Sequence, residues 1–146
     1  MSLKQLMDAI SIISQTASAR DEELHKKHGL DLGLTMGDPA SIAYLSEARE
    51  TSTPLINYLE KLAPEDVKKL VTVMYAGRDV SNFKDAGSLR TFHADLKIAG
   101  VHDKEKSAYI RIISEKIMNL AHYFKSASDL SAEMGIDIDA DLSHVR

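Results

Sequence analysis

The sequence predicts an all-α fold, a single-domain bundle of about six or seven helices. Apolar residues recur at spacings of three and four along most of the 146 residues, which is typical of helices that bury one face. Proline or a capping residue precedes several of these segments and glycine follows them, as expected at helix starts and ends. Aromatic residues make up only 5% of the chain and tryptophan is absent, so we expect a mostly aliphatic core.

The first predicted helix covers residues 3–28. Its second half is highly polar, and Gly29 is a plausible C-terminal cap. A glycine-rich connector is expected over 29–38, because glycines cluster there. Pro39, which follows an aspartate, is then a good first residue for a short helix over 39–49.

Two further segments repeat this pattern of a proline in the first turn. In residues 51–62, Pro54 follows a serine and a threonine that can cap the helix. In residues 63–77, Pro64 precedes two acidic residues, which favour the positive end of the helix dipole. We expect Gly77 to stop this helix in a left-handed conformation with a positive φ.

The next expected helix covers residues 81–99. Its apolar residues lie on one face with basic residues nearly opposite, and Gly100 terminates it. A short helix is expected over 128–134, with Gly135 as its end. Both assignments rest on a glycine placed directly after a periodic segment.

A long helix is expected over residues 104–124, with Asp103 as its cap. Its apolar residues cover more of the circumference than a one-sided surface stripe would. This pattern has two interpretations. The segment is either the central helix of the bundle or part of a self-association face.

Residues 1–135 are expected to form the helical domain and residues 136–146 an acidic tail. The tail alternates apolar and acidic side chains, so it is either disordered or lies on the body. Its isolated aliphatic side chains are expected to bury little area and to add little stability.

Composition excludes several classes of protein. The chain has no cysteine, which rules out disulfides, thiolate zinc sites and cysteine nucleophiles and agrees with a reducing cytosol. The first residues lack the basic and apolar regions of a signal peptide. No apolar run approaches the roughly 18 residues of a membrane span, so no membrane partner is expected.

Net charge argues against nucleic acid as a partner. The chain has 18 basic and 22 acidic residues, and the acidic excess lies in residues 127–146. A neutral body with an acidic end lacks the basic footprint of a nucleic-acid binder. The best candidate face, with Arg90, His93 and Lys97, is interpreted as a solvated helix face.

Two patterns partly match metal sites, and neither predicts one. His25 and His28 are spaced to share a helix face, but the sequence supplies no third ligand, so a solvated face is expected. Asp137, Asp139 and Asp141 occupy the first positions of a calcium loop, yet the sixth position holds leucine instead of glycine. No metal and no other cofactor is therefore predicted.

The sequence contains no recognisable catalytic constellation. It has no phosphate-binding loop, no dinucleotide-binding glycine pattern and no nucleophile elbow. The adjacent carboxylates Glu22 and Glu23 would point about 100° apart on a helix and do not form an acid–base pair by spacing alone. No catalytic residue is predicted, and an enzyme is the less favoured interpretation.

The stretch LVTVMYAGRDVSNF, from Leu70 to Phe83, places two opposite charges directly behind a glycine. In one interpretation it is a corner, where Arg78 reaches the last carbonyls of one helix and Asp79 or Ser81 caps the next. In the other it is a small anion or partner site. Tyr75, Arg78 and Asp79 are the candidate binding residues in that case.

The segment LINYLEKLAPEDVKKLVTVMYAGRD, Leu55 to Asp79, resembles the central signature of a bacterial family named domain of unknown function 3775. The matching positions are Val73, Met74, Tyr75, Gly77, Arg78 and Asp79. The family has a further glycine between the arginine and the aspartate, and a tryptophan where this chain has tyrosine. The resemblance implies a helical fold and a bacterial or phage origin, and it brings no activity with it.

Together these observations predict a non-enzymatic, cytosolic interaction or regulatory protein that binds a protein partner or a second copy of itself. A second hypothesis is an inhibitor or immunity protein whose acidic tail masks a basic site on a toxin or nuclease. A third is a small-anion-binding protein or enzyme centred on Arg78.

Overall fold

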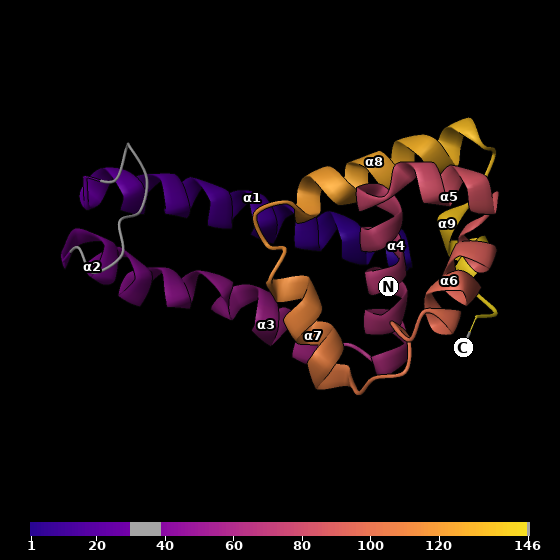
Figure 1. The fold of residues 1–146 in the computed structure, drawn as a ribbon, viewed down its shortest axis with the longest axis horizontal. Coiled ribbons are helices and arrows are strands. Elements are labelled where there is room, and N and C mark those ends of the chain that lie inside the picture. Colours follow the sequence, from indigo (N-terminus) through magenta and orange to yellow (C-terminus); the bar gives the residue numbers. More distant parts are fainter. Residues whose placement is uncertain (30–38, 146) are drawn as a thin grey trace.

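The computed structural model describes residues 1–29 and 39–145, and over these ranges the protein is entirely helical, as predicted (Figure 1). In these ranges no helix is both long enough and apolar enough to span a lipid bilayer. The connector expected over 29–38 lies outside the described residues except for Gly29. The elements are α1 (Leu3–Lys27), α2 (Pro39–Ala48), the 3₁₀-helix η1 (Arg49–Ser52), α3 (Thr53–Glu60), α4 (Pro64–Arg78), α5 (Val80–Ala86), α6 (Leu89–Ile98), α7 (Lys106–Ser114), α8 (Leu120–Glu133) and α9 (Ile138–Leu142).

Helix α1 forms where the sequence predicts it. Ser2 and Gln5 make a reciprocal capping box, in which each side chain accepts a hydrogen bond from the other's backbone amide. Its buried residues recur at helical spacing. They are Leu3, Leu6, Met7, Ile10, Ser14, Ala17 and Leu24. Gly29 follows the helix with a φ of 67°, as expected of a C-terminal cap.

Helix α4 is the central helix of the bundle. It is buried over most of its circumference, and it packs against α8, α7, α6 and α5. Figure 1 shows it upright in the right-hand part of the molecule, with α8 crossing over its upper end. Pro64 occupies the first turn, and Glu65 and Asp66 lie at the positive end of the helix dipole, as predicted.

The prediction of a single long helix over residues 104–124 is wrong. The chain forms α7, turns through residues 115–119 and begins α8, which also absorbs the short helix expected over 128–134. A straight helix would present its apolar residues along one line. Both α7 and α8 contact α4, and Figure 1 shows α7 beside its lower part and α8 across its upper end. The turn leaves the Ile117 carbonyl free to accept a hydrogen bond from the Ser14 hydroxyl of α1. Most of the apolar residues of this segment are buried inside the chain, whereas Met118 is 40% exposed. Self-association stays a prediction.

Two other helix boundaries also differ from expectation. The helix expected over 81–99 is divided into α5 and α6 by Gly87, whose φ is 81°. Ser88 then caps α6, because its hydroxyl accepts a hydrogen bond from the amide of Thr91 at 3.0 Å. Asp103 does not cap the following helix. That position belongs to Glu105, whose side chain makes no capping bond.

Residues 136–145 lie on the body, and the expectation that they bury little area is wrong. Leu142 is fully buried and Ile138 nearly so. Asp139 accepts hydrogen bonds from the first amides of α1, at 2.5 Å from Leu3 and 3.3 Å from Lys4. Asp141 does the same for α6, and its nearer contact is 2.6 Å from the Leu89 amide.

Gly77 does not stop α4 with a positive φ. The helix continues through it to Arg78, and Gly77 is absent from the positive-φ glycines of the described residues. Its role is close packing, because the position where a Cβ would stand is occupied by the backbone of Tyr123 on α8. A glycine at a helix contact lets two backbones approach further than any side chain would allow.

The second half of α1, α2 and η1 form an arm that projects from the bundle (Figure 1). Helices α1 and α2 enclose a small separate apolar cluster of Leu24 and Tyr44. Polar contacts add to it: Tyr44 donates a hydrogen bond to Asp21, and the ammonium of Lys27 lies 2.8 Å from Glu47. The arm therefore has its own contacts instead of resting on the main core.

Candidate functional site

The structure brings together the three residues predicted as a binding site, Tyr75, Arg78 and Asp79. The guanidinium carbon of Arg78 lies 4.5 Å from the centre of the Tyr75 ring. The Nε and Nη2 atoms of Arg78 lie 3.3 and 3.1 Å, respectively, from the two carboxylate oxygens of Asp79. The hydrogen bond to Asp79 is the largest cause that raises the pKa of Arg78. The positive charge of Arg78 is thus balanced by the carboxylate of the next residue, Asp79.

Asp79 is also the residue at which the chain turns. It ends α4 and occupies the N-cap position of α5, with φ −111° and ψ 58°. Its side chain makes no capping bond to α5, which is consistent with the use of both oxygens by Arg78. The chain turns at this corner, but the predicted capping bond from Asp79 is wrong, and Arg78 pairs with the Asp79 carboxylate instead of with the last carbonyls of α4. An anion at Arg78 would have to displace Asp79.

A buried polar cluster, formed by Thr72, His93 and His102, was missed by the sequence analysis. The Thr72 hydroxyl oxygen lies 2.7 Å from His93 Nδ1 and 2.7 Å from His102 Nε2. The two imidazoles stack with their centres 4.4 Å apart. His93 is 3% exposed, so its assignment to a solvated face with Arg90 and Lys97 is wrong. The one available signal was Thr72, a lone polar residue within an otherwise apolar run.

The hydrogen-bond donors and acceptors of this cluster limit its protonation states. The Thr72 hydroxyl has one hydrogen, and the Lys68 carbonyl oxygen lies 3.4 Å away as a further acceptor. The hydroxyl therefore donates only one of its three contacts, and at least one imidazole must donate an N–H to it. His102 Nδ1 is buried without a hydrogen-bond partner. Burial, followed by His93 and Lys68, lowers the pKa of His102 from 6.5 to about 3. The cluster joins α4, α6 and the segment before α7, and all three of its side chains are buried.

The two histidines considered as metal ligands lie between α1 and α2, not on a solvated face. His25 packs on the ring of Tyr44 with centres 4.6 Å apart. His28 Nε2 lies 3.4 Å from Glu47, and its side chain is largely buried. Within the described ranges no three potential ligands cluster closely enough to hold a metal ion.

The three aspartates considered as a calcium loop cap three different helices. Asp137 accepts a hydrogen bond from the Ala140 amide of its own helix, α9, at 3.0 Å. Asp139 and Asp141 serve α1 and α6, as described above. Their spacing in the sequence follows the geometry of α9, and their carboxylates diverge instead of meeting at one point.

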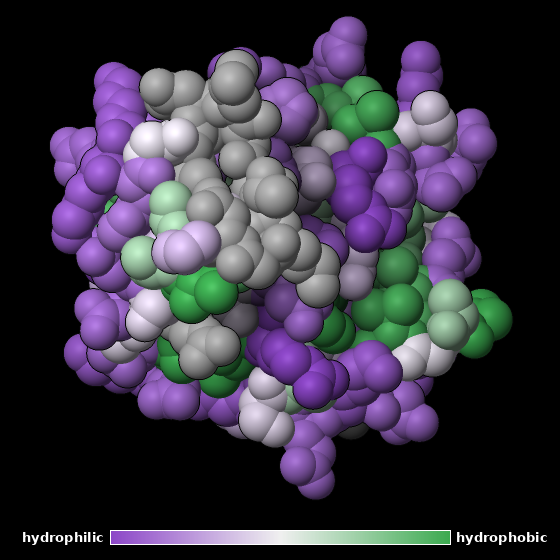
Figure 2. Space-filling view, turned by 60° about the vertical axis from the view of Figure 1, so that its left-hand side comes forward, coloured by the Kyte–Doolittle hydropathy of each residue, from purple (hydrophilic) through white to green (hydrophobic). Residues whose placement is uncertain are grey.

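Several exposed apolar side chains lie on the arm or close to its base. Ile12 on α1 is 64% exposed, and Ile42 and Leu45 on α2 are 58% and 49% exposed. Met118 lies beside the arm, 3.7 Å from the Ser18 hydroxyl of α1. A groove of about 160 Å³ runs along the base of the arm, lined by Ile12, Ile13, Thr16, Ala17, Arg20, Thr51 and Pro54. Figure 2 looks toward the arm and shows hydrophobic residues interspersed with polar ones.

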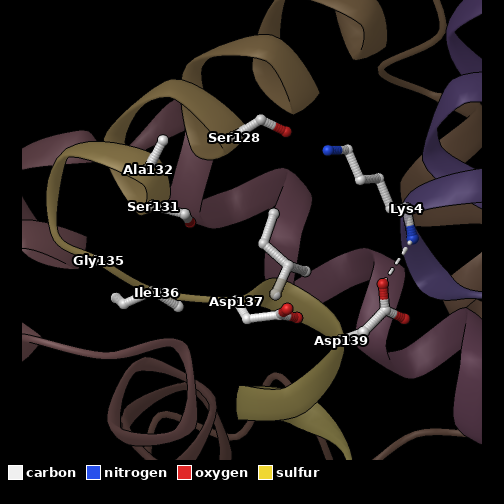
Figure 3. Close-up of a pocket in the computed structure, with 9 residues that line it drawn as sticks. Lys4, Ser128, Ser131, Ala132, Gly135, Ile136, Asp137 and Asp139 are labelled. Atoms are coloured by element: carbon white, nitrogen blue, oxygen red, sulfur yellow. Dashed lines mark hydrogen bonds between the residues drawn. The ribbon is translucent and has the colours of Figure 1, made fainter.

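A second cavity, which we call the polar pocket, lies where the end of α8 and the starts of α9 and α1 meet (Figure 3). It measures about 390 Å³. Its lining combines charged, hydroxyl and aliphatic side chains. These residues are Lys4, Ser128, Ser131, Ala132, Gly135, Ile136, Asp137, Ile138 and Asp139. None of them was predicted as a site residue, since they come together only when α9 docks.

No family model, curated protein or solved structure matches this chain. The resemblance to domain of unknown function 3775 therefore stays a prediction based on residues Leu55 to Asp79.

Proposed function

We propose that this chain is a non-enzymatic interaction or regulatory protein that binds a protein partner through the arm. The observation that carries the proposal is the distribution of exposed apolar side chains. Apart from Met1, six large apolar residues are exposed in the described ranges. Four of these six lie on or beside the arm: Ile12, Ile42, Leu45 and Met118. Apolar surface of this kind gains roughly 25 cal/mol per Å² when a partner covers it.

The arm also has the architecture of a binding element. Its helices contact each other through Tyr44, Asp21 and Glu47, so its outer face is held in place without help from the main core. Isolated exposed apolar residues are ordinary on protein surfaces, whereas several of them on and beside one projecting element are typical of an interaction site. The alternative is that a second copy of this chain binds the same face.

The other two hypotheses have less support. An inhibitor with a free acidic arm needs carboxylates that are available to a basic partner, and Asp137, Asp139 and Asp141 are engaged as helix caps. An anion site at Arg78 must compete with Asp79. The cytosolic location stays part of the proposal and rests on the absence of cysteine. A bacterial or phage origin rests on the family resemblance alone.

The test compares the parent with an Ile42→Ser, Leu45→Ser variant and with Ile98→Ser as the matched control. Ile98 is 85% exposed and lies away from the arm on α6. Affinity capture from the native host identifies the partner, and its Kd is then measured with purified protein. Sedimentation equilibrium measures self-association of the chain alone.

We expect the arm variant to weaken partner binding or self-association by about tenfold or more, while Ile98→Ser behaves like the parent. Circular dichroism checks that both variants remain helical. Equal affinity of the parent and the arm variant would contradict the proposal.

A further inference from the structure

We propose that the polar pocket binds a small zwitterion of the free α-amino acid class, with its carboxylate toward Lys4 and its ammonium toward Asp137. This inference is independent of the arm and of the protein partner proposed for it. It rests on the groups that line the pocket, on the opposite charges of Lys4 and Asp137 and on a buried hydroxyl without a partner.

The side chains at the pocket divide into donors and acceptors by position. Figure 3 shows the Lys4 ammonium extending toward Ser128 on one side, with Asp137 and Ile136 on the other. Asp139 does not compete for a ligand ammonium, because its oxygens already accept hydrogen bonds from the amides of Leu3 and Lys4. Asp137 uses Oδ1 to cap α9, which leaves Oδ2 for a ligand.

The charged side chains at the pocket have both signs. Lys4 belongs to the first turn of α1, where Asp139 already accepts hydrogen bonds from the amides of Leu3 and Lys4. The Lys4 ammonium is therefore the group that offers a positive charge to a ligand, and Asp137 is the carboxylate with an oxygen that is not used in capping. A dipolar ligand that places one charge against each of these groups is favoured over a simple anion or cation, since each of those is attracted at one side and repelled at the other.

Ser131 provides the second, independent observation. Its side chain is 1% exposed, and its hydroxyl has no hydrogen-bond partner. A buried hydroxyl without a partner is costly, so such groups in folded proteins call for an explanation. Ser131 and Ser128 lie one turn apart on the pocket face of α8. A ligand carboxylate held by Lys4 would give these hydroxyls an acceptor.

The aliphatic part of the lining sets the size of the ligand. Ile136 and Ile138 supply methyl groups, and Ala132 leaves space on α8. A cavity of about 390 Å³ falls within the size range of sites for small molecules. These features suit an amino acid with a short aliphatic side chain.

The experiment uses the full chain and follows its ¹H–¹⁵N resonances during titration with glycine, alanine or valine at millimolar concentrations. Sodium acetate and ethylammonium chloride are the matched probes that carry one charge each. We expect saturable shifts at the amides of residues 128–139 with an amino acid, and affinity at least about tenfold lower for acetate or ethylammonium. The absence of saturable shifts, or equal affinity for acetate, would overturn the proposal.

Ser131→Ala separates ligand binding from folding, with Ser126→Ala on the same helix as its control. Ser126 does not line the pocket. The Ser131 variant removes a hydroxyl that has no partner, so its melting temperature should equal or exceed that of the parent. Its affinity for the amino acid should fall about fivefold or more, while Ser126→Ala binds like the parent. Unchanged affinity of Ser131→Ala would also overturn the assignment.

Discussion

A Cβ atom added to Gly77 would stand 1.7 Å from the backbone carbonyl oxygen of Tyr123, so α4 and α8 touch there through their backbones. No side chain is small enough for that space, and the obstacle is main chain that cannot rotate away. The contact fixes the separation of the central helix from the helix that crosses it.

Gly77→Ala is therefore expected to destabilise the fold by about 3 kcal/mol or more, because one of the two backbones must move. Gly100→Ala is the control. Gly100 has a φ of 83° but open space at its Cβ, so its cost should be the smaller one of about 1–2 kcal/mol for a left-handed residue. Urea unfolding measures the free energy of unfolding of both variants and shows which substitution costs more. A larger loss at Gly100 would contradict the close-packing explanation.

Removal of the residues after Gly135 should destabilise the protein by several kcal/mol. The truncation exposes the surface that Leu142 covers and removes the caps that Asp139 and Asp141 provide. Asp139→Ala and Asp141→Ala should each cost about 1 kcal/mol, the usual value of an N-cap.

Asp129→Ala is the control for these caps. It breaks an exposed pair with Lys125 on α8 and should cost only about 0.3–0.5 kcal/mol. Thermal and urea unfolding compare the variants. A melting temperature unchanged by the truncation would show that α9 contributes nothing to the fold.

The buried histidine cluster makes stability depend on pH. The pKa of His102 lies at about 3 in the folded chain, below the ordinary 6.5 of the unfolded chain. Between these values the unfolded state binds the extra proton, so stability is full above pH 6.5 and falls as the pH drops toward 3. The loss amounts to about 2 kcal/mol at pH 5 and at most roughly 5 kcal/mol at pH 3.

His102→Gln tests this assignment, because its amide group can reach the Thr72 hydroxyl but does not titrate. Urea unfolding between pH 7 and pH 4 should show a shallower pH dependence for this variant than for the parent. His144→Gln, at an exposed position, should keep the slope of the parent. Equal slopes for all three proteins would assign the pH dependence to other groups.

Arg78→Ala should cost only about 0.3–1 kcal/mol, and Asp79→Ala a similar amount. Both side chains are partly exposed, and such ion pairs contribute little in water. A double-mutant cycle with Asp79→Ala measures their coupling, which should decrease as salt is added. A coupling above about 2 kcal/mol would mean that the pair is better shielded than its exposure indicates.

The sequence was sufficient for the helical class and for α1, because an uninterrupted apolar period with a capping box and a following glycine points to one structure. It was insufficient wherever a boundary depends on distant parts of the chain. The turn at 115–119 contains neither glycine nor proline, and it exists because α7 and α8 must reach different parts of α4. Gly87 and Ser88 did carry a local stop and start signal, which the periodicity of the surrounding apolar residues obscured.

The same reasoning explains the sites. Tyr75, Arg78 and Asp79 are close in the sequence, so their contact could be anticipated. Thr72, His93 and His102 come from three segments, and His93 shares its surroundings in the sequence with charged residues that do face solvent. A glycine such as Gly77 is ambiguous by itself, since a helix stop and a close helix contact require the same residue.

The capping of α1 by Asp139 has a consequence for synthesis on the ribosome. Helix α1 depends for its leading amides on a carboxylate that is translated more than a hundred residues later. Until Asp139 emerges, those amides must be solvated by water, and the first turn of α1 can fray. Completion of α1 is thus expected to wait for α9, and the fold acquires its full cooperativity only when these two helices meet.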